Sequence, residues 1–320
     1  MIKVGIIGGA GYTAGELIRL LVNHPEVELA FVHSSSNAGA KLCEVHSGLL
    51  GDTEMRFCDS FDLKTIDVLF LCSAHGKSRE FWSENERPEC LKVIDLAQDF
   101  RDESEGYVYG LPEMQKSRIE GAKLIANPGC FATAIQLALL PLAAAHLLPD
   151  EVQVNAITGS TGAGVKPGST THFSWRNSNI SVYKAFTHQH LIEISRDLKM
   201  LQPDFSGKIN FVPMRGDFAR GIFASVCVDS AMSLEEAVEL YRNYYAGAAF
   251  TYVSDSPVDL KQVVNTNKCV ISLEKHEDKL LICSVIDNLL KGASGQAVQN
   301  MNIIFGLDEK TGLKLKASAF

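Results

Sequence analysis

A glycine-rich segment, Gly8–Gly15, separates a short β-branched run at Lys3–Ile7 from a helical pattern at Tyr12–Asn23. Glycines at such a junction let backbone N–H groups approach a dinucleotide pyrophosphate at the start of a helix. The spacing departs from GxGxxG, and the alternative is a turn required for close helix–sheet packing. Its position directly after the first strand favours a nucleotide-binding loop. The candidate cofactor-binding residues here are Gly8, Gly11, Tyr12, Thr13 and Ala14.

The first part of the chain continues this alternation of short apolar strands with loops or helical stretches. The order is typical of a parallel α/β sheet and extends to about residue 130. From Val152 onward, strand-like runs are less regularly interleaved with helices, which predicts an α+β second domain. The strands expected after the first are 27–32, 68–72, 92–94, 124–126, 152–157, 208–212, 222–228, 269–273 and 280–286.

A length of 320 residues with 46% hydrophobic content suits two cores. The formal net charge of -8 argues against a general polyanion-binding surface, so we expect no nucleic acid as a partner. The eight cysteines include no CxxC pair and no clustered His/Cys spacing, so we expect neither a metal site nor a dense disulfide framework. No secretory signal precedes the first strand, which favours a cytoplasmic protein.

Two helices are predicted within the second part of the chain. Residues 131–148 approach the length and apolarity of a membrane span but include Gln136, Pro141 and His146 and lack basic anchors, so we predict a buried helix and no membrane association. Ser233 and Glu236 form a capping-box pattern that opens another helix. The final stretch, 293–305, is also helical in pattern and can pack back on the first domain.

The tetrapeptide Asn127–Cys130 places a thiol where a tight turn gives way to the buried helix. A thiol of ordinary pKa, about 8.5, is mostly protonated at neutral pH, whereas the positive dipole end of a helix stabilises the thiolate. Cys130 is therefore the candidate nucleophile. The alternative is a cysteine that serves as a small buried hydrophobic residue.

The second strand ends at His33–Asn37, where an NAD-binding protein usually carries an acid for the ribose 2′-hydroxyl. No acid stands there. The hydroxyl groups of Ser35 and Ser36 and the charge of Lys41 can instead accept a 2′-phosphate, so we expect NADP as the cofactor. The alternative is an ordinary polar loop. Two further candidate cofactor contacts are Ser73 and Gly162.

A thiolate nucleophile works with an imidazole that holds the ion pair and exchanges protons. His188 and His190 precede an apolar run, 191–194, that predicts the start of a helix, so both are expected in the loop or cap before it. Residues two apart in an extended segment face the same way, so either histidine can reach a common site. The alternative is a pair of surface histidines that cap the helix.

A second glycine-rich loop, Gly159–Lys166, follows a strand and can present N–H groups, hydroxyls and a lysine charge to an anion. Arginines suit carboxylates and phosphates because the guanidinium is a planar fork of donors. The alternative for each arginine is a solvated or salt-bridged side chain. The candidate substrate-binding residues are Arg101, Asn127, Ser160, Lys166 and Arg220.

Seven ordered segments carry a resemblance to a known family over nearly the whole chain: Gly8–Leu17, Asp95–Arg101, Tyr109–Glu113, Asn127–Thr133, Ser160–Lys166, His188–Ile194 and Leu290–Asn302. The chain is similar to the N-acetyl-γ-glutamyl-phosphate reductases. The resemblance implies that Cys130 is the nucleophile and that His188 or His190 is the acid/base. It also implies a Rossmann-type NADP domain over 1–130, a catalytic and dimerisation domain of the semialdehyde dehydrogenase type over 131–292, and a C-terminal helix over 293–320 that returns to the NADP domain.

The segment Phe211–Gly221 departs from the family pattern. A Pro-His-Leu stretch before Arg-Gly is common in the family, whereas Met214 stands at the expected histidine. Arg215 and Asp217 are unusual neighbours as well. The departure leaves room for a different N-acyl group on the substrate, such as succinyl in place of acetyl.

The implied reaction is the NADPH-dependent reduction of N-acetyl-γ-L-glutamyl phosphate, a small-molecule acyl phosphate, to N-acetyl-L-glutamate 5-semialdehyde and phosphate in arginine biosynthesis. Cys130 forms a thioester that accepts the hydride, and the histidine holds the thiolate and protonates the hemithioacetal oxygen. A homodimer or homotetramer is expected. The alternatives are the same chemistry on an aspartyl or acyl-aminoadipyl phosphate, a cysteine hydrolase or acyltransferase, and a nucleotide-sensing binding protein.

Overall fold

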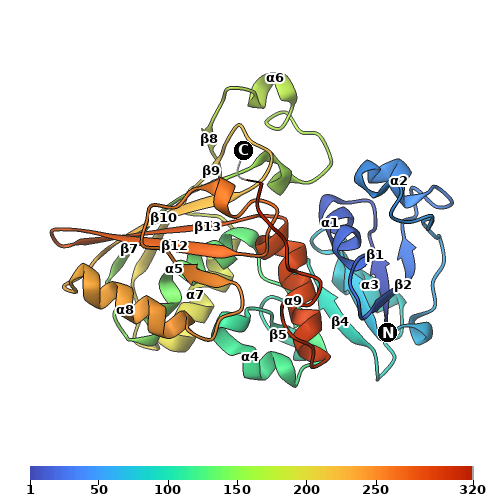
Figure 1. Cartoon of the computed structure of the whole chain (residues 1–320), viewed down its shortest axis with the longest axis horizontal. Helices are drawn as coiled ribbons and strands as arrows, with labels where there is room; N and C mark the ends of the chain where they lie inside the picture. Colours follow the sequence, from blue (N-terminus) through green and yellow to red (C-terminus); the bar gives the residue numbers. More distant parts are fainter. Residues whose placement is uncertain (319–320) are drawn as a thin grey trace. The chain divides into compact units, whose positions relative to one another are not determined.

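The computed structural model describes residues 1–318 and divides into two compact units (Figure 1). The first unit combines Met1–Pro128 with Ala293–Lys314, so both ends of the chain contribute to it. The second unit comprises Gly129–Gly292 together with the segment that starts at Leu315. Residues 319–320, which end the C-terminal segment predicted from the sequence, lie outside the described residues.

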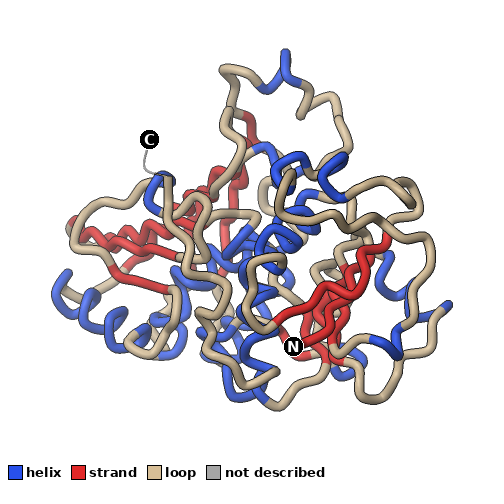
Figure 2. The backbone as a smooth tube through the Cα atoms, turned by 45° about the vertical axis from the view of Figure 1, so that its right-hand side comes forward, coloured by secondary structure: helices blue, strands red, loops and turns tan. Residues whose placement is uncertain are grey.

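The first unit is built on a six-stranded sheet in the order β2-β1-β3-β4-β6-β5. Every pairing in it is parallel, which confirms the predicted Rossmann-type sheet. The strands are the red segments of the backbone in Figure 2. Only β5 was not expected, because a strand of two residues has no measurable alternation. The strands are β1 (Ile2–Ile7), β2 (Val27–His33), β3 (Val68–Leu71), β4 (Lys92–Asp95), β5 (Val108–Tyr109) and β6 (Leu124–Ala126).

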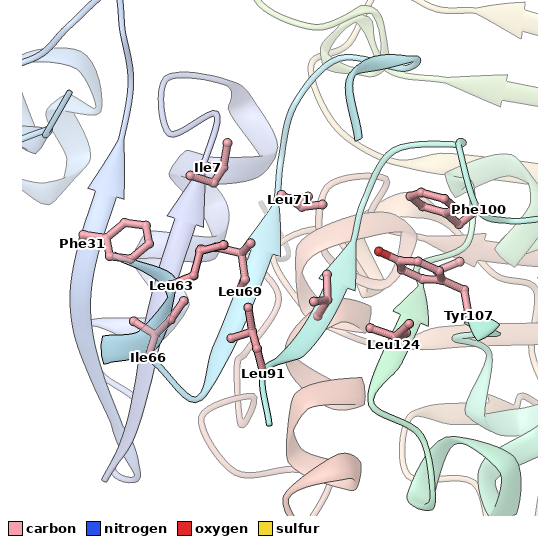
Figure 3. Packing of buried hydrophobic residues seen from close by; sticks show 12 residues of the cluster. Ile7, Phe31, Leu63, Ile66, Leu69, Leu71, Leu91, Phe100, Tyr107 and Leu124 are labelled. Atoms are coloured by element: carbon pink, nitrogen blue, oxygen red, sulfur yellow. The ribbon is translucent and has the colours of Figure 1, made fainter. Parts of the chain in front are cut away.

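Buried side chains on this sheet form the hydrophobic cluster drawn in Figure 3, which extends from Phe31 on β2 to Leu124 on β6. Parallel strands are covered on both faces, so their sequences read as continuous apolar runs, as in Val68–Leu71. The helices of this unit are α1 (Tyr12–Leu21), α2 (Leu42–Val45), α3 (Lys77–Glu84), α4 (Pro112–Glu120) and α9 (Gly295–Ile304).

Helix α9 is buried along its whole length and contacts α1, α4 and β4. Its polar residues are satisfied inside the unit: Gln296 Nε2 and Asn300 Nδ2 both donate to the backbone carbonyl of Gly110, at 2.8 and 2.9 Å. A Cβ on Gly110 would lie 2.7 Å from Ile125 Cγ2, so only glycine allows the loop to approach this closely. The C-terminal helix is therefore an interior element of the first unit.

The second unit is built on a seven-stranded mixed sheet in the order β11-β12-β13-β10-β7-β9-β8. The β7–β9 and β11–β12 pairs are parallel, and the others are antiparallel. The α+β prediction is confirmed, and only the short strands β8 and β11 were not expected. The strands are β7 (Glu151–Thr158), β8 (Ser181–Val182), β9 (Lys208–Arg215), β10 (Ile222–Asp229), β11 (Thr251–Val253), β12 (Cys269–His276) and β13 (Lys279–Ile286).

The helices of the second unit are α5 (Cys130–Ala144), α6 (Phe173–Arg176), α7 (His190–Leu201) and α8 (Leu234–Tyr245). Residues 131–143 of α5 are all buried, where the helix contacts β10, β12 and β13 and also α7 and α8, which confirms the predicted buried helix. Ser233 and Glu236 close the predicted capping box on α8. No helix within residues 1–318 combines the length and apolar character needed to cross a bilayer.

Short helical turns complete the chain. The 3-10 turns are Ser47–Leu49, Leu63–Thr65, Ser104–Gly106, Ser160–Ala163 and Leu260–Gln262, and a π-helical turn covers Leu290–Ser294.

Candidate active site

Cys130 is the first residue of α5, and Gly129 in extended conformation is its N-cap. The thiol therefore lies at the end of the helix where backbone N–H groups lack intrahelical partners and the dipole is positive. The helix behind it is long and fully packed, which fixes the position of the sulfur. This is the setting that the sequence predicted for a nucleophile.

The residue before the cysteine lies against the first turn of α7. The backbone N–H of Gly129 donates to Glu193 Oε2 at 3.0 Å. A Cβ on Gly129 would lie 2.6 Å from Cε1 of His190 and 2.7 Å from Oε1 of Glu193, so no larger residue fits there. His190 and Glu193 are themselves 3.9 Å apart (Nε2–Oε1), and both are buried. The imidazole of His190 is thus held between a carboxylate and the turn that carries Cys130.

A second close approach comes from the π-helical turn at Leu290–Ser294. A Cβ on Gly292 would lie 2.8 Å from the Cβ of Cys130 and 3.3 Å from the carbonyl oxygen of Asp287. The N–H of Gly292 donates to that carbonyl at 2.9 Å. Gly292 therefore covers one side of the cysteine without occupying the space of a side chain.

His188 lies among aromatic rings: its ring centroid is 5.5 Å from Phe131, 5.8 Å from Tyr183 and 5.4 Å from Phe211. Burial lowers the pKa of His188 to about 4, and the positive charges of Lys184 and Arg215 add to the shift. The ring is consequently neutral at neutral pH. Its Nδ1 accepts a hydrogen bond from the backbone N–H of His190 at 3.2 Å, which orients the start of α7.

The two histidines do not have the same surroundings, although their ring centroids are only 4.6 Å apart. His190 is the first residue of α7 and lies beside a carboxylate, whereas His188 precedes the helix and lies beside cations. The expectation that both lie before the helix is therefore wrong for His190. The apolar run that marked the helix begins one residue after its true start.

Tyr183 and Arg215 extend the site on the side of His188. Burial raises the pKa of Tyr183, and the charge of Cys130 raises it further. The Cζ atom of Arg215 lies 4.6 Å from the centre of the Tyr183 ring, within the range of a cation–π interaction. Arg215 thus gives the site a cationic edge. From the sequence, Arg215 was noted only as an unusual residue within Phe211–Gly221.

Arg220, predicted to bind substrate, is engaged by a buried carboxylate. Its Nε and Nη2 donate to the two oxygens of Asp287 at 3.0 and 3.2 Å, a bidentate ion pair. Asp287 also accepts the backbone N–H groups of Asn265 and Leu289. The pair fixes the loop before Gly221, and the charge of Arg220 is largely balanced.

The loop predicted to bind an anion forms a 3-10 turn, Ser160–Ala163, directly after β7. The backbone N–H of Ser160 donates to Phe218 O at 2.8 Å, and the Thr161 hydroxyl donates to Ala219 O at 2.6 Å. Within this turn, Gly162 lies near the side chain of Thr158, the last residue of β7. Lys166 follows the turn and is exposed. The loop is therefore tied to the segment that leads into Arg220.

In the first unit, the glycine loop has the form required of a nucleotide cradle. Gly8 adopts φ +81°, and a Cβ there would lie 2.9 Å from both Cys72 C and Ser73 N. Gly11 is the N-cap of α1, so Tyr12 and Thr13 are its first residues. A Cβ on Gly11 would approach only the carbonyl oxygen of Gly8, at 4.0 Å, so the loop leaves the N-terminus of α1 open and the residues fit a dinucleotide pyrophosphate there.

Ala14 follows in the first turn of α1 with its side chain buried in the core. Any contact from this residue to a cofactor is therefore made by its backbone. Ser73, whose backbone lies against Gly8, follows β3.

The loop after β2 is polar and partly ordered by its own hydrogen bonds. Asn37 Nδ2 donates to the hydroxyls of Ser34 and Ser36, at 3.1 and 2.9 Å. Ser35 and Ser36 are exposed, as a 2′-phosphate contact requires. Lys41 is paired with Glu54 at 2.6 Å, which raises the pKa of the lysine.

Arg56 is a further cation beside this loop. Its backbone pairs with that of Lys41 in an isolated antiparallel β-bridge, and its Nη1 donates to Gly39 O at 2.6 Å. Arg56 could not be predicted as a site residue from the sequence pattern, because it lies in an irregular segment.

Arg101 and Asn127 are both buried in the first unit. Arg101 donates from Nε to the carbonyl of Asn127 at 2.8 Å and from Nη2 to Leu96 O at 3.1 Å. The Asn127 side chain donates to Ala293 O at 3.0 Å and accepts from Asn300 at 3.2 Å. In this structure both residues hold the turn after β6, and their role toward a substrate stays a prediction.

Glu193 is the main site residue that the sequence analysis did not single out. Residues three apart share a helix face, so the spacing of His190 and Glu193 was a usable signal. It was missed because the neighbours of Glu193 are apolar and the segment was interpreted as an apolar run. Gly129 and Gly292 were part of recognised motifs, yet their close contacts are visible only in three dimensions. Within residues 1–318 no cluster of three or more acidic, His or Cys side chains could hold a metal ion.

Two families match the chain. The family described as "Semialdehyde dehydrogenase, NAD binding domain" matches residues 3–122, and "Semialdehyde dehydrogenase, dimerisation domain" matches residues 130–288. Solved structures share the fold: an aspartate semialdehyde dehydrogenase II from Vibrio cholerae has a TM-score of 0.75 at 16% identity and covers 96% of this chain and 98% of its own. An aspartate semialdehyde dehydrogenase with NADP from Candida albicans has a TM-score of 0.74 at 16% identity and covers 95% of this chain and 98% of its own. The chain has the two-domain organisation of semialdehyde dehydrogenases.

Curated relatives are more similar in sequence than these solved structures, and their names identify the family within the semialdehyde dehydrogenases. Proteins named N-acetyl-gamma-glutamyl-phosphate reductase from Bacteroides thetaiotaomicron, Azobacteroides pseudotrichonymphae and Flavobacterium johnsoniae are 61%, 62% and 55% identical, each over 100% of both chains. The chain belongs to the N-acetyl-gamma-glutamyl-phosphate reductase family. The resemblance noted from its sequence motifs is confirmed.

Proposed function

We propose that the chain reduces N-acetyl-γ-L-glutamyl phosphate to N-acetyl-L-glutamate 5-semialdehyde and phosphate with NADPH, in arginine biosynthesis. The names of its relatives support this activity. The structural observation that carries the chemistry is the position of Cys130 at the N-terminus of buried α5, with His190 packed on the preceding residue.

In the first step the Cys130 thiolate attacks the acyl carbon. A C–S bond forms, the C–O bond to the phosphate breaks, and phosphate leaves with the electron pair. Backbone N–H groups at the start of α5 stabilise the tetrahedral oxyanion, a contribution of about 3 kcal/mol per donor in comparable sites. The helix dipole favours the thiolate in the same place.

NADPH, when bound, supplies the hydride that reduces the thioester carbon. His190 donates a proton to the hemithioacetal oxygen and takes it back as the aldehyde forms. The C–S bond then breaks and returns the electron pair to Cys130 as thiolate. His190 is chosen over His188 because it lies against Gly129 and beside the Glu193 carboxylate, which supports its charged form. Because the pKa of His188 is about 4, its ring is neutral at neutral pH and lacks the second ring proton that a general acid donates.

The cofactor is held by the loop after β1 and the start of α1, with Gly8, Gly11, Tyr12, Thr13 and Ala14 at the pyrophosphate and Ser73 beside it. The exposed hydroxyls of Ser35 and Ser36 and the cation Arg56 favour the 2′-phosphate of NADP. Lys41 is proposed as a further contact, and Glu54 offsets part of its charge. Gly162 remains a proposed cofactor contact.

The substrate anions are assigned to Arg101, Asn127, Ser160, Lys166 and Arg220. The structure qualifies this assignment, because Arg220 is paired with Asp287 and the side chain of Asn127 is bonded within the first unit. Ser160 and Lys166 lie in or beyond the turn after β7 and keep the role of anion contacts.

Residues 1–130 are proposed as the NADP domain, 131–292 as the catalytic and dimerisation domain, and 293–320 as the C-terminal segment whose helix, α9, belongs with the NADP domain. The second unit matches a dimerisation family, and a homodimer or homotetramer in the cytoplasm is the proposed assembly. No nucleic acid or membrane partner is proposed.

Steady-state kinetics with N-acetyl- and N-succinyl-γ-glutamyl phosphate side by side test the assignment. We expect NADPH oxidation to equal phosphate release with at least one of them. Turnover of aspartyl or acyl-aminoadipyl phosphate instead would move the substrate to a neighbouring class. Phosphate release without NADPH oxidation would indicate a hydrolase, and NADPH binding without turnover of any acyl phosphate would indicate a nucleotide sensor.

A further inference from the structure

Arg215 is the last residue of β9, between two neighbouring strands. It is opposite Thr158 on β7 and Ser181 on β8, so its backbone is fixed from both sides. Strand ends that are anchored in this way position a side chain precisely enough for recognition. Arg215 also belongs to the segment in which the sequence departs from the family pattern.

The guanidinium of Arg215 lies beside Tyr183, next to the side chains that surround His188. Its Cζ lies 4.6 Å from the Tyr183 ring centre, and it hydrogen-bonds the Tyr183 hydroxyl. Tyr183 is in turn 5.8 Å from His188, between ring centroids, and close enough to Cys130 for the thiolate to act on it electrostatically. Arg215 therefore faces the same group of side chains as the nucleophile.

The charge of Arg215 is not balanced by the protein. Its Nε is buried and has no hydrogen-bond acceptor, and no carboxylate within residues 1–318 forms an ion pair with it. By contrast, Arg220 is paired with Asp287 and Arg196 with Asp197. A buried donor that lacks an acceptor is costly, so a group that supplies one binds strongly there.

The groups around Arg215 add positive charge. Nη1 of Arg176 donates to the carbonyl of Arg215 at 2.5 Å, and Lys184 lies near enough to act on His188. Asp217 accepts the backbone N–H of Ser178 at 2.5 Å and its charge acts on Arg176, so one carboxylate stands against the three cations Arg176, Lys184 and Arg215. This edge of the site is therefore cationic and suited to an anion.

We infer that Arg215 binds a carboxylate of the acyl-glutamyl substrate and so determines which acyl-glutamyl compounds the enzyme accepts. This inference rests on the proposed function. The carboxylate has two possible sources: the α-carboxylate of the glutamyl moiety, or a terminal carboxylate on a dicarboxylic N-acyl group. A guanidinium binds either through two parallel hydrogen bonds, which an ammonium cannot reproduce.

The test runs the reaction in reverse, where semialdehyde and inorganic phosphate are separate substrates and their KM values are measured independently. The variants are Arg215→Gln and Arg215→Lys, with Lys208→Gln as a control that removes an exposed charge at the opposite end of β9. For Arg215→Gln we expect the KM of the semialdehyde to rise about tenfold or more, as loss of a charge-assisted contact predicts. The KM of phosphate stays within about twofold.

Arg215→Lys should give an intermediate rise, and Lys208→Gln none. A semialdehyde KM that stays unchanged in Arg215→Gln, or a rise confined to the phosphate KM, would overturn the inference. If Arg215→Gln does not fold, Arg215→Lys decides by the same two KM values. Wild-type protein that turns over no acyl-glutamate semialdehyde would instead refute the proposed function.

The N-acetyl and N-succinyl semialdehydes distinguish the two sources of the carboxylate. An equal rise in KM for both in Arg215→Gln assigns the contact to the α-carboxylate. A rise for the succinyl compound alone assigns it to the acyl terminus, and the wild type then prefers that compound.

Discussion

The backbone N–H of Gly129 donates to the carboxylate of Glu193 at 3.0 Å and joins the start of α5 to the first turn of α7. The same carboxylate lies 3.9 Å from His190. One buried acid therefore sets the position of the turn that carries Cys130 and the orientation of the imidazole beside it. Glu193 acts through these two groups and is a positioning residue.

Replacement of Glu193 by Gln is expected to lower kcat by about 10- to 100-fold, because an amide keeps an acceptor for Gly129 but loses the charge that supports protonated His190. The KM of NADPH should not change. The measurement is the pH dependence of kcat, in which the variant should lose the limb that belongs to the histidine. An unaltered pH profile would show that Glu193 has only a structural role.

Cys130→Ser is expected to abolish turnover, by a factor of about a thousand or more, since a hydroxyl at this position lacks the low pKa of a thiol. NADPH binding, followed by fluorescence titration, should be retained because the glycine loop is untouched. Cys90→Ser, which changes an exposed cysteine, is the matched control. Full activity of Cys130→Ser would remove the thioester from the mechanism.

His190→Asn and His188→Asn are expected to differ. Loss of the acid/base at His190 should reduce kcat by about 10²- to 10⁴-fold, whereas His188→Asn should affect mainly the orientation of the loop and cost less. Single-turnover reduction of the pre-formed acyl-enzyme gives the comparison. A larger loss in His188→Asn than in His190→Asn would reverse the assignment.

His188 should make the protein less stable in mild acid. Its folded-state pKa, about 4, lies below its ordinary value of 6.5, so between these values the unfolded chain binds a proton that the folded chain does not. The free energy of unfolding therefore falls as pH decreases through this window, by up to about 1.4 kcal/mol per pH unit from this group. Urea unfolding of His188→Gln at pH 7 and 4.5 should show a smaller loss than the wild type. The exposed His276→Gln serves as the control, and equal losses in wild type and His188→Gln would contradict the expectation.

Ser36→Asp should shift the cofactor preference. A carboxylate in this exposed loop repels the 2′-phosphate of NADPH and can accept the 2′-hydroxyl of NADH. We expect kcat/KM to fall about tenfold or more with NADPH and to rise with NADH. Ser117→Asp adds the same charge on the exposed face of α4 and should leave the ratio unchanged. An unchanged ratio in Ser36→Asp would place the 2′-phosphate elsewhere.

Much of this architecture could be predicted because its signals are local. The glycine loop after β1, the continuous apolar runs of the parallel strands and the capping box at Ser233 each depend on neighbouring residues only. Even the position of Cys130 at the start of α5 follows from the turn residues before it and the apolar run after it. Short strands such as β8 could not be found, since two residues show no period.

The contacts within the candidate site could not be predicted in the same way. The pairings of Arg220 with Asp287 and of Gly129 with Glu193 join residues 67 and 64 positions apart in the sequence. The ion pairs of Arg220 with Asp287 and of Lys41 with Glu54 decide which cations are balanced and which remain available to an anion. The sequence therefore identifies arginines and lysines only as candidate anion contacts. The structure shows that Arg220 is paired with a carboxylate and that Arg215 Nε has no hydrogen-bond acceptor.

The interior position of α9 in the first unit has a consequence for how the protein is made. Residues 1–128 leave the ribosome before the second unit is made, whereas the amide groups of Gln296 and Asn300 that hydrogen-bond Gly110 emerge only after residues 129–292. The nucleotide-binding unit is therefore incomplete until the second unit has been synthesised, and the surfaces of α1, α4 and β4 that α9 covers stay exposed in the meantime. A premature stop codon shortly before residue 293 would disable the N-terminal half of the molecule rather than trim its end.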